Sequence, residues 1–408
     1  MLASGLAPGS RLIRMTHCSL GDTVQRAGPA YAGRVGSWLR ERRLLSQFCA
    51  EAVLQGSASK TMALATVPLS LRMHVEGHDT VTLRAPARLH LGFLDPSASL
   101  GRRFGSIGVV IEGFETGVEL SAALVDRVTA DTPEGDDQTE RAAAHLCALR
   151  EHSGCAEPLQ LRLLRVLPAH GGFGSGTQLA LAIGRAFAQW HRLDLSTPTL
   201  AHWLGRGQRS GIGIHGFDLG GLLVDGGPSA NGYPAPLLSR IALPEGWRIL
   251  VVQDRREQGL AGNEEQGAMA GLGAMPAARA AEICHEVLMN VLPGAAGADF
   301  GSFAVGVSRV QKLLGEYFAP MQSGRSYTSA AVGRLMDWIG ASAHPAAIGQ
   351  SSWGPTGFAI VESQSRAEAL EHAARAAALI APGLLLRIVA PRNRGAEIID
   401  RRVTRRAR

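Results

Sequence analysis

One glycine-rich stretch decides how this chain folds: residues 168–178 have the sequence PAHGGFGSGTQ. It joins a predicted strand over 159–167 to a predicted amphipathic helix over 175–191. Glycines let main-chain N–H groups turn toward one point, and the start of a helix adds unpaired N–H donors. The stretch lacks the lysine of the P-loop motif, but it still predicts a phosphate-binding loop. The alternative is a tight turn closed by a capping box from Ser175 to Gln178. The candidate phosphate-binding residues are His170, Gly171, Gly172, Gly174, Ser175, Gly176, Thr177 and Gln178.

Strand and helix patterns extend outward on both sides of this loop. Apolar residues alternate from Val81 to Phe93, as they do in strands. Strands and helices are mixed without strict alternation, which predicts an α+β fold in two lobes, with mixed and antiparallel sheets. Further strands are predicted over 107–112, 117–124, 217–224, 248–253, 357–362 and 384–390, and helices over 137–152, 276–291, 298–318, 328–341 and 365–380.

The domain boundaries follow the composition. We expect an N-terminal extension over 1–72 that is poorly ordered, and a basic tail over 392–408. Between them, an N-terminal lobe over 73–231 carries the phosphate loop, and a C-terminal lobe covers 232–391. Within the extension, Met62 and the nearby Met73 are alternative start positions.

Charge and composition exclude several classes of protein. Residues 1–61 and 392–408 each carry a net charge of +5, so 62–391 carries −4, which argues against a nucleic-acid-binding surface. Hydrophobic residues make up 46% of the chain and charged residues 19%, enough apolar material for a buried core. No apolar run reaches the roughly 18 residues of a membrane helix, so we expect no membrane partner. The five scattered cysteines suggest neither a disulfide framework nor a zinc site, and favour a reducing cytoplasm.

A second motif, APARLHLGFLD over 85–95, places Arg88 and His90 two residues apart on a predicted strand. Side chains at that spacing share one face of a strand, so together they could grip an anionic group. The alternative is an arginine paired with a surface acid and a histidine bonded to the main chain.

A third motif, RSGIGIHGFD over 209–218, surrounds His215 and Asp218 with glycines. A turn of this kind can present both titratable groups, so that Asp218 could hold Mg²⁺ or steer a proton and His215 could bind substrate. The alternative is a glycine-rich connection in which Asp218 caps a turn.

A fourth motif, IGQSSWGPTG over 348–357, gathers polar side chains around Trp353 before a predicted strand. A tryptophan in such a loop can form the wall of a site for an aromatic substrate. The alternative is a loop with a purely structural tryptophan.

Together these segments resemble the GHMP kinase superfamily and, within it, the β-ribofuranosylaminobenzene 5′-phosphate synthase family. The resemblance runs from Val81 to Pro391, and its six motifs occur in the family's order. They are APARLHLGFLD, FGSIGVVIE, GFGSGTQLALAIG, GIGIHGFDLGGLLVDGG, GNEEQ and GQSSWGPTGF.

The resemblance implies an enzyme that condenses phosphoribosyl pyrophosphate with 4-aminobenzoate and releases pyrophosphate and carbon dioxide, on the route to tetrahydromethanopterin. The sequence leaves open whether the acceptor is 4-aminobenzoate or 4-hydroxybenzoate. Mg²⁺ is the implied cofactor, bridging the pyrophosphate. The expected partners are these small molecules, and a homodimer is compatible with the family.

The resemblance also implies roles for single residues. Arg88, His90, Arg209 and His215 are candidates to bind the carboxylate or the 5′-phosphate. Asp218 and Glu264 are candidates to contact the metal or the ring amine. Trp353 is a candidate ring wall, with polar partners Gln350, Ser351, Ser352 and Thr356.

The chain departs from the kinases of the superfamily at two places. The run after the glycines is Ser175-Gly176-Thr177-Gln178 rather than a Ser-Ser-Ala type, and the third loop carries Ser351-Ser352-Trp353 where the kinases are rich in glycine. Both differences argue against phosphoryl transfer from ATP. An ATP-dependent small-molecule kinase nevertheless remains the alternative function.

Overall fold

The computed structural model describes residues 13–14, 79–229, 232–260 and 262–402, without the side chains of 13–14 and 262–266. Apart from residues 13–14, the N-terminal extension expected over 1–72 lies outside these residues. The described residues from 79 onward belong to one compact unit.

The first sheet is built on two long antiparallel strands, β2 (Thr80–Asp95) and β3 (Phe104–Ala122). The segments expected as separate strands over 107–112 and 117–124 are two parts of β3. The β2–β3 register shifts between Pro86 and Arg88, because proline has no N–H to donate to the ladder. The other strands of this sheet are β1 (Ile13–Arg14), β4 (Arg127–Ala130), β5 (Leu159–Arg165), β6 (Leu222–Asp225), β7 (Leu237–Ile241) and β12 (Glu397–Asp400).

The two sheets differ in strand direction. In the first, β4 and β5 run parallel and the other described pairs are antiparallel, so the sheet is mixed. The second sheet is antiparallel throughout its described strands, in the order β11, β8, β10, β9. Their bounds are β8 (Arg248–Asp254), β9 (Ala347–Gln350), β10 (Thr356–Val361) and β11 (Leu384–Val389).

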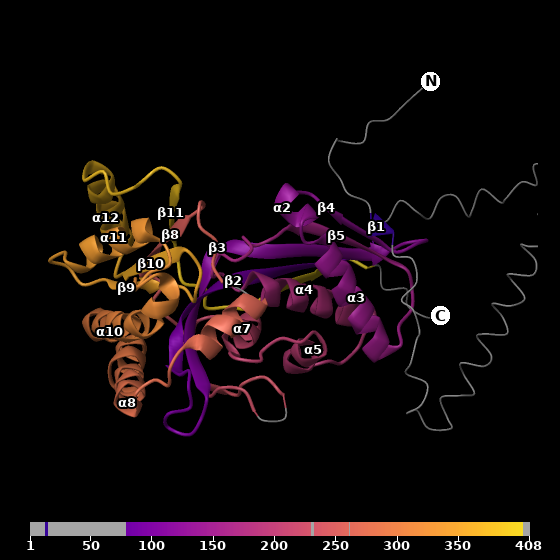
Figure 1. Cartoon of the computed structure of the whole chain (residues 1–408). Coiled ribbons are helices and arrows are strands. Elements are labelled where there is room, and N and C mark those ends of the chain that lie inside the picture. The colour runs from indigo at the N-terminus through magenta and orange to yellow at the C-terminus, as the bar shows by residue number, and fades with distance from the viewer. Residues whose placement is uncertain (1–12, 15–78, 230–231, 261, 403–408) are drawn as a thin grey trace, which may run out of the picture. The chain divides into compact units, whose positions relative to one another are not determined.

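Helix α4 (Ser175–Trp190) lies against the first sheet, where it contacts β2 and β3 (Figure 1). Its buried residues include Leu179, Ile183 and Phe187, which recur at helical spacing and face the strands. The helix therefore starts next to β2, and the glycine-rich loop before it lies beside that strand. The other helices of this part are α2 (Pro133–Asp136), α3 (Thr139–Ser153), α5 (Thr197–Trp203) and α6 (Ile212–Leu219).

The strand expected over 217–224 is wrong in its first half. Phe217 lies in helix α6, and the strand β6 begins only at Leu222. Gly220 and Gly221, between them, both have positive φ, which ends the helix and turns the chain into the strand.

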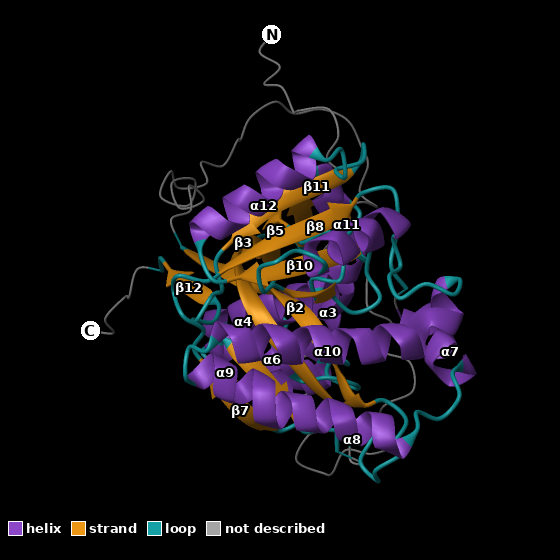
Figure 2. Cartoon of the chain, turned by 90° about the vertical axis from the view of Figure 1, so that its left-hand side faces the viewer, coloured by secondary structure: helices purple, strands orange, loops and turns teal. Residues whose placement is uncertain are grey.

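Among the helices that follow β8, α11 (Ala330–Gly340) and α12 (Gln364–Ala376) pack on the second sheet, and α10 (Phe300–Phe318) contacts strands of both sheets (Figure 2). The segment expected as one helix over 276–291 is helical throughout, but its last turn is a π-helix, η3. Across the described residues, no helix combines the length and the apolar character needed to cross a membrane. The bounds are α7 (Gly262–Gly271), α8 (Ala277–Glu286), η3 (Val287–Val291), α9 (Leu292–Ala296), α10 (Phe300–Phe318), η4 (Ala319–Gln322), α11 (Ala330–Gly340) and α12 (Gln364–Ala376).

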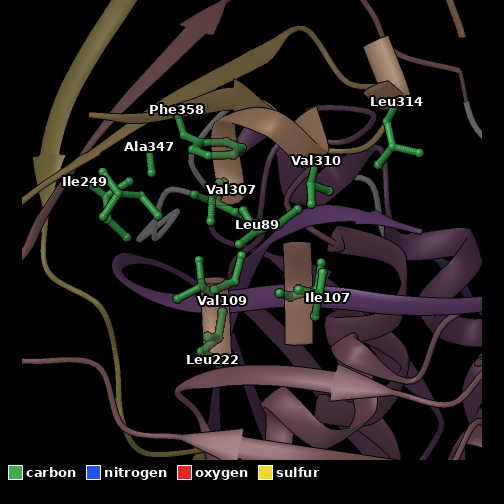
Figure 3. Packing of buried hydrophobic residues seen from close by; sticks show 14 of the residues in the cluster. Leu89, Ile107, Val109, Leu222, Ile249, Val307, Val310, Leu314, Ala347 and Phe358 are labelled. Carbon is green, nitrogen blue, oxygen red and sulfur yellow. The ribbon is translucent and has the colours of Figure 1, made fainter. Parts of the chain in front are cut away.

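One hydrophobic cluster joins the two sheets, with α10 between them (Figure 3). Val307 and Val310 of α10 belong to the same cluster as Leu89 of β2 and Phe358 of β10. Burying each of these side chains stabilises the fold by about 1.5–3 kcal/mol. This packing fixes the middle of β2, and with it Arg88 and His90, the two neighbours of Leu89 in the chain.

The basic segment expected as a tail over 392–408 is part of the fold as far as residue 402. Strand β12 pairs with β2, and the buried side chain of Arg392 forms an ion pair with Glu112 at 2.9 Å. Arg402 donates to the main-chain oxygens of Trp190 and Gln189. These arginines have partners within the fold, so composition alone misplaced them; residues 403–408 lie outside the described residues.

Candidate active site

The glycine loop leaves the first turn of α4 open. Gly174 is the N-cap residue, with φ of +79°, and no side chain among the described residues caps the helix. The alternative reading as a capping box from Ser175 to Gln178 is therefore wrong: the side-chain amide of Gln178 instead donates to the main-chain oxygen of Gly213 at 2.8 Å. The N–H groups of Ser175 and Gly176 occupy the first turn, where α-helical geometry provides no carbonyl partner one turn earlier. These donors and the positive end of the helix dipole suit an anion.

Arg88 lies directly against this loop. Its Nη1 donates to the main-chain oxygen of Gly172 at 2.6 Å, and its own N–H donates to the oxygen of Phe173 at 3.2 Å. A Cβ placed on Gly174 would lie 3.2 Å from the guanidinium carbon. Glycine at 174 therefore lets the cation lie against the loop, next to the start of the helix.

Ser351 ties the C-terminal loop to the glycine loop and to β2. Its buried hydroxyl donates to the main-chain oxygen of Gly172 at 2.7 Å and accepts the N–H of His90 at 2.9 Å. The N–H of Ser352 donates to the oxygen of His90 at 3.2 Å. Gly172 has φ of +85°, and a Cβ there would lie 2.4 Å from the oxygen of Ser351. Three of the four predicted motifs thus meet at Gly172.

His90 is buried at this junction as a neutral ring. Its Nε2 has no hydrogen-bond partner among the described residues. Burial, Arg88 and Arg209 together hold the pKa of His90 well below its usual value. The ring packs against Phe93, with centroids 4.7 Å apart. The prediction that Arg88 and His90 act together is thus compatible with their placement, but only Arg88 contributes positive charge at neutral pH.

A small cavity of about 30 Å³ lies beside His90. It is well below the roughly 150 Å³ of a cavity that holds a benzene ring. Trp353 lines this cavity, but it is only 4% exposed and packs edge-on against Phe318, so it presents no open face to an aromatic ring in this structure. The lining residues are His90, Gly92, Phe93, Gln311, Leu314, Gly315, Phe318, Gln322, Ser326, Gln350, Ser352 and Trp353.

The glutamines that line the cavity are already bonded within the protein. Gln350 donates to Gln322 and to the oxygen of Ser352, both at 2.9 Å, and accepts the N–H of Thr328 at 2.6 Å. Gln311 donates to the main-chain oxygen of Leu91 at 2.6 Å and accepts the N–H of Gln350 at 2.7 Å. Their first role is therefore to fix the loop that carries Ser351.

Other predicted residues have structural partners elsewhere. His215 makes a 2.8 Å hydrogen bond from Nε2 to the main-chain oxygen of Ala235. Asp218 is exposed, and its carboxylate accepts the hydroxyl of Thr197 at 2.6 Å, on the α5 side of α6. The hydroxyl of Thr356 is buried in β10 without a described partner.

Two further predicted residues, Arg209 and Glu264, allow no such placement. The positive charge of Arg209 acts on His90 and helps to lower the pKa of that ring. Glu264 belongs to α7, but its side chain lies outside the described residues.

The described carboxylates do not form a magnesium site. No group of three or more metal-binding side chains occurs among the described residues. Asp225, the buried carboxylate nearest the third motif, accepts the N–H groups of Gly211 and Gly227 and the hydroxyl of Ser210. Burial raises its pKa, and its acceptor positions are occupied, so the donor set does not suit a resident Mg²⁺.

Three further residues near the loop were not predicted. Arg141 and Arg206 approach Gly176, and His145 lies beside Arg206. Arg141 and His145 are four residues apart on the helix expected over 137–152, a spacing that places them on one face. This four-residue spacing was the feature of the sequence that could have pointed to a basic pair on one helix face.

Comparison with known proteins agrees with this geometry. The family model "GHMP kinases N terminal domain" matches residues 139–222, and "GHMP kinases C terminal" matches 304–379. A mevalonate diphosphate decarboxylase from Staphylococcus aureus has the same fold, with a TM-score of 0.56 at 13% identity, over 79% of this chain and 98% of that one.

Two curated relatives share more of the sequence, and both are named beta-ribofuranosylphenol 5'-phosphate synthase. That of Archaeoglobus fulgidus is 32% identical over 69% of this chain and 88% of its own length. That of Methanothermobacter thermautotrophicus is 28% identical over 78% of this chain and 98% of its own length. With its glycine loop, both superfamily domains and this extent of identity, the chain belongs to the β-ribofuranosylphenol 5′-phosphate synthase family of the GHMP kinase superfamily.

Proposed function

We propose that this chain joins C1 of phosphoribosyl pyrophosphate to the ring of 4-aminobenzoate, with release of pyrophosphate and carbon dioxide. The observation that carries the proposal is the contact of Arg88 with the glycine loop at the open start of α4. That arrangement suits a diphosphate, while the names of the relatives point to a ribosylated aromatic product.

The donor side of the reaction needs stabilisation of the departing charge. As the bond between C1 and the pyrophosphate oxygen breaks, C1 takes on oxocarbenium character and the pyrophosphate takes the electron pair. In this proposal the guanidinium of Arg88, which contacts the loop, and the first-turn N–H of Ser175 stabilise that charge. Removal of one such preorganised donor commonly costs a factor of about 10²–10³ in rate.

The acceptor side needs no strong base. The amino group directs electron density to the ring carbon that bears the carboxylate, and that carbon forms the new bond to C1. The bond to the carboxylate then breaks, its electron pair restores the aromatic ring, and carbon dioxide leaves in place of a proton. A neutral His90 is compatible with this chemistry, because the step requires no proton acceptor.

We place the acceptor at the cavity beside His90. His90 is bonded through its main chain to Ser351 and Ser352, so the cavity adjoins the loop that would hold the pyrophosphate. Because the cavity holds only about 30 Å³, a ring enters only if Phe318 and Trp353 separate. The free Nε2 of His90 is then a hydrogen-bonding group for the acceptor.

Mg²⁺, as a counter-ion of the sugar donor, would help to offset the negative charge of the departing pyrophosphate. No step above depends on it. The product would feed the tetrahydromethanopterin pathway in the cytoplasm.

The names of the relatives favour a second acceptor, 4-hydroxybenzoate, because decarboxylation of that acid yields a phenol. The same electron flow applies, with the hydroxyl in place of the amine. The two acceptors therefore compete for one site, and the ratio of their kcat/KM values decides between them.

The test is an assay with phosphoribosyl pyrophosphate, Mg²⁺ and each acid labelled in its carboxyl group. We expect labelled carbon dioxide in proportion to pyrophosphate, and more from 4-aminobenzoate than from 4-hydroxybenzoate. A parallel reaction with ATP tests the kinase alternative. Release of ADP with a phosphorylated acceptor, and no labelled carbon dioxide, would contradict the proposal.

A further inference from the structure

A second group of basic side chains faces the glycine loop from the side of α3. A Cβ placed on Gly176 would lie 3.4 Å from Nη1 of Arg206 and 3.9 Å from Nη1 of Arg141. A Cβ on Gly174, two residues earlier at the N-cap of α4, would instead lie 3.2 Å from the guanidinium of Arg88. Two glycines two residues apart thus expose the loop to two separate sets of cations.

The α3 set has no acidic partner among the described residues. Burial and the adjacent Arg141 lower the pKa of Arg206. Burial, Arg206 and Arg141 lower the pKa of His145 to about 4, so this ring is neutral at pH 7. Its Nε2 lies 3.4 Å from Nη2 of Arg206. The described polar contact of the Arg141 side chain is with the neutral amide of Gln138, at 3.2 Å.

Two like charges held together near a positive helix end repel each other unless an anion lies between them. Guanidinium groups with planar donors are well suited to a phosphate. Gly176 has no side chain, so an anion can approach both guanidinium groups and the N–H of Gly176 together.

We propose that Arg141, Arg206 and the start of α4 at Gly176 bind a phosphomonoester, the 5′-phosphate of the sugar donor. The inference rests on the proposed function for the identity of the ligand. Arg88 is coupled through Gly172 and Ser351 to His90, which lines the acceptor cavity. The end of the donor that reacts must be at that cavity, so C1 and its pyrophosphate lie on the Arg88 side. The 5′-phosphate, at the far end of the ribose, then lies on the Arg206 side.

The experiment measures binding by calorimetry with two probes, ribose 5-phosphate and inorganic pyrophosphate. We expect Arg206→Gln and Arg141→Gln each to weaken ribose 5-phosphate binding at least tenfold, while Arg88→Gln changes it less than threefold. Arg88→Gln should weaken pyrophosphate binding at least tenfold. Arg334→Gln, an exposed arginine on α11, is the matched control and should bind both probes like the wild type.

Folding is controlled in two ways. Arg141 is exposed, so its replacement should leave the thermal transition unchanged even if the more buried Arg206 variant is destabilised. Gly176→Ala keeps every cation but places a methyl group in the path of the anion, and should also weaken ribose 5-phosphate binding.

Wild-type affinity for ribose 5-phosphate in Arg141→Gln and Arg206→Gln would overturn the inference, as would no measurable binding by the wild-type chain. The carbon dioxide assay separates this failure from that of the proposed function. Labelled carbon dioxide with unaltered ribose 5-phosphate binding in the variants rejects only the 5′-phosphate site. Selective loss of ribose 5-phosphate binding without any carbon dioxide release keeps the phosphate site and rejects the synthase.

Discussion

Arg88 and Gly172 lie 84 residues apart in the chain, and a 2.6 Å hydrogen bond joins the guanidinium of one to the main-chain oxygen of the other. Strand β2 thereby holds the glycine loop from outside the loop itself. Ser351 donates to the same oxygen at 2.7 Å, from the opposite end of the sequence. The loop is thus positioned jointly by both halves of the fold.

Arg88→Ala should lower kcat/KM at least about 100-fold, because it removes a cation from the point where pyrophosphate charge develops. The fold should persist, since Ser351 still satisfies the oxygen of Gly172. Steady-state kinetics with thermal unfolding checks both statements. Arg84→Gln is the control on the same strand: its ion pair with Glu397 is long, at 4.0 Å, and solvent-exposed, so turnover should not change. Wild-type turnover of Arg88→Ala would remove this residue from the site.

Ser351→Ala should destabilise the protein. The change leaves the buried N–H of His90 without its acceptor, which costs about 1–3 kcal/mol, or about 1.5–4 °C in Tm for a chain of this size. Differential scanning calorimetry measures this shift. Ser365→Ala, at an exposed position on α12, should leave Tm within about 1 °C of the wild type. Equal Tm values for the two variants would show that the hydroxyl of Ser351 does not tie the segments together.

Local patterns were enough to predict much of the fold. The helix expected over 175–191 matches α4, and the one expected over 328–341 matches α11 to within two residues. Periodicity succeeded there because each helix buries one apolar face. The glycine loop could likewise be predicted from its glycines and the helix that follows them. The pairing of Arg88 with His90 could be predicted from their spacing on a strand, because all of these are local properties of the sequence.

Contacts between distant segments could not be predicted in the same way. Arg206 approaches Gly176 only because the turn after α5 returns to the start of α4. Trp353 was predicted to be a ring wall because polar side chains surround it in its loop, but Phe318, 35 residues earlier, packs edge-on against it. Asp218 shows the opposite error. Its glycine-rich surroundings suggested that its carboxylate binds a metal ion or steers a proton, but the carboxylate accepts a hydrogen bond from a hydroxyl of α5.

Gly172→Ala should be far more disruptive than Gly205→Ala. Both glycines have positive φ, which costs an alanine about 1–2 kcal/mol. A Cβ on Gly205 meets nothing within 4 Å, whereas one on Gly172 lies 2.4 Å from a main-chain oxygen. Urea unfolding should therefore show a loss of about 1–2 kcal/mol for Gly205→Ala and a larger loss, with little activity, for Gly172→Ala. Similar free energies of unfolding for the two variants would mean that the main-chain oxygen of Ser351 does not lie against Gly172.

His90→Phe should raise the KM for the aromatic acid about tenfold or more and leave the KM for phosphoribosyl pyrophosphate nearly unchanged. The phenyl ring keeps the packing against Phe93 but has no Nε2 to bond the acceptor. Loss of one hydrogen bond of this kind is worth about 0.5–1.5 kcal/mol, and more where a buried polar group loses its partner. Initial rates with each substrate varied in turn give both constants. A rise confined to the sugar donor would place the acceptor away from His90.

The stability of the chain should fall in mild acid through His145, and the effect should disappear in His145→Gln. The ordinary pKa of histidine, 6.5, applies to the unfolded chain, and burial beside Arg206 and Arg141 lowers the folded value to about 4. Between these values the unfolded chain binds a proton that the folded chain does not, so stability is complete above pH 6.5 and is lost as pH falls toward 4.

At pH 5 this loss should be about 2 kcal/mol relative to pH 7.5. Guanidinium unfolding in phosphate-free buffer at both pH values measures it, because an anion bound at Arg206 would favour the protonated ring. Since other histidines also titrate, the informative quantity is the difference between wild type and variant. His152→Gln, exposed on the same helix, should keep the wild-type pH dependence. The same loss in His145→Gln as in the wild type would show that His145 is not held neutral by its surroundings.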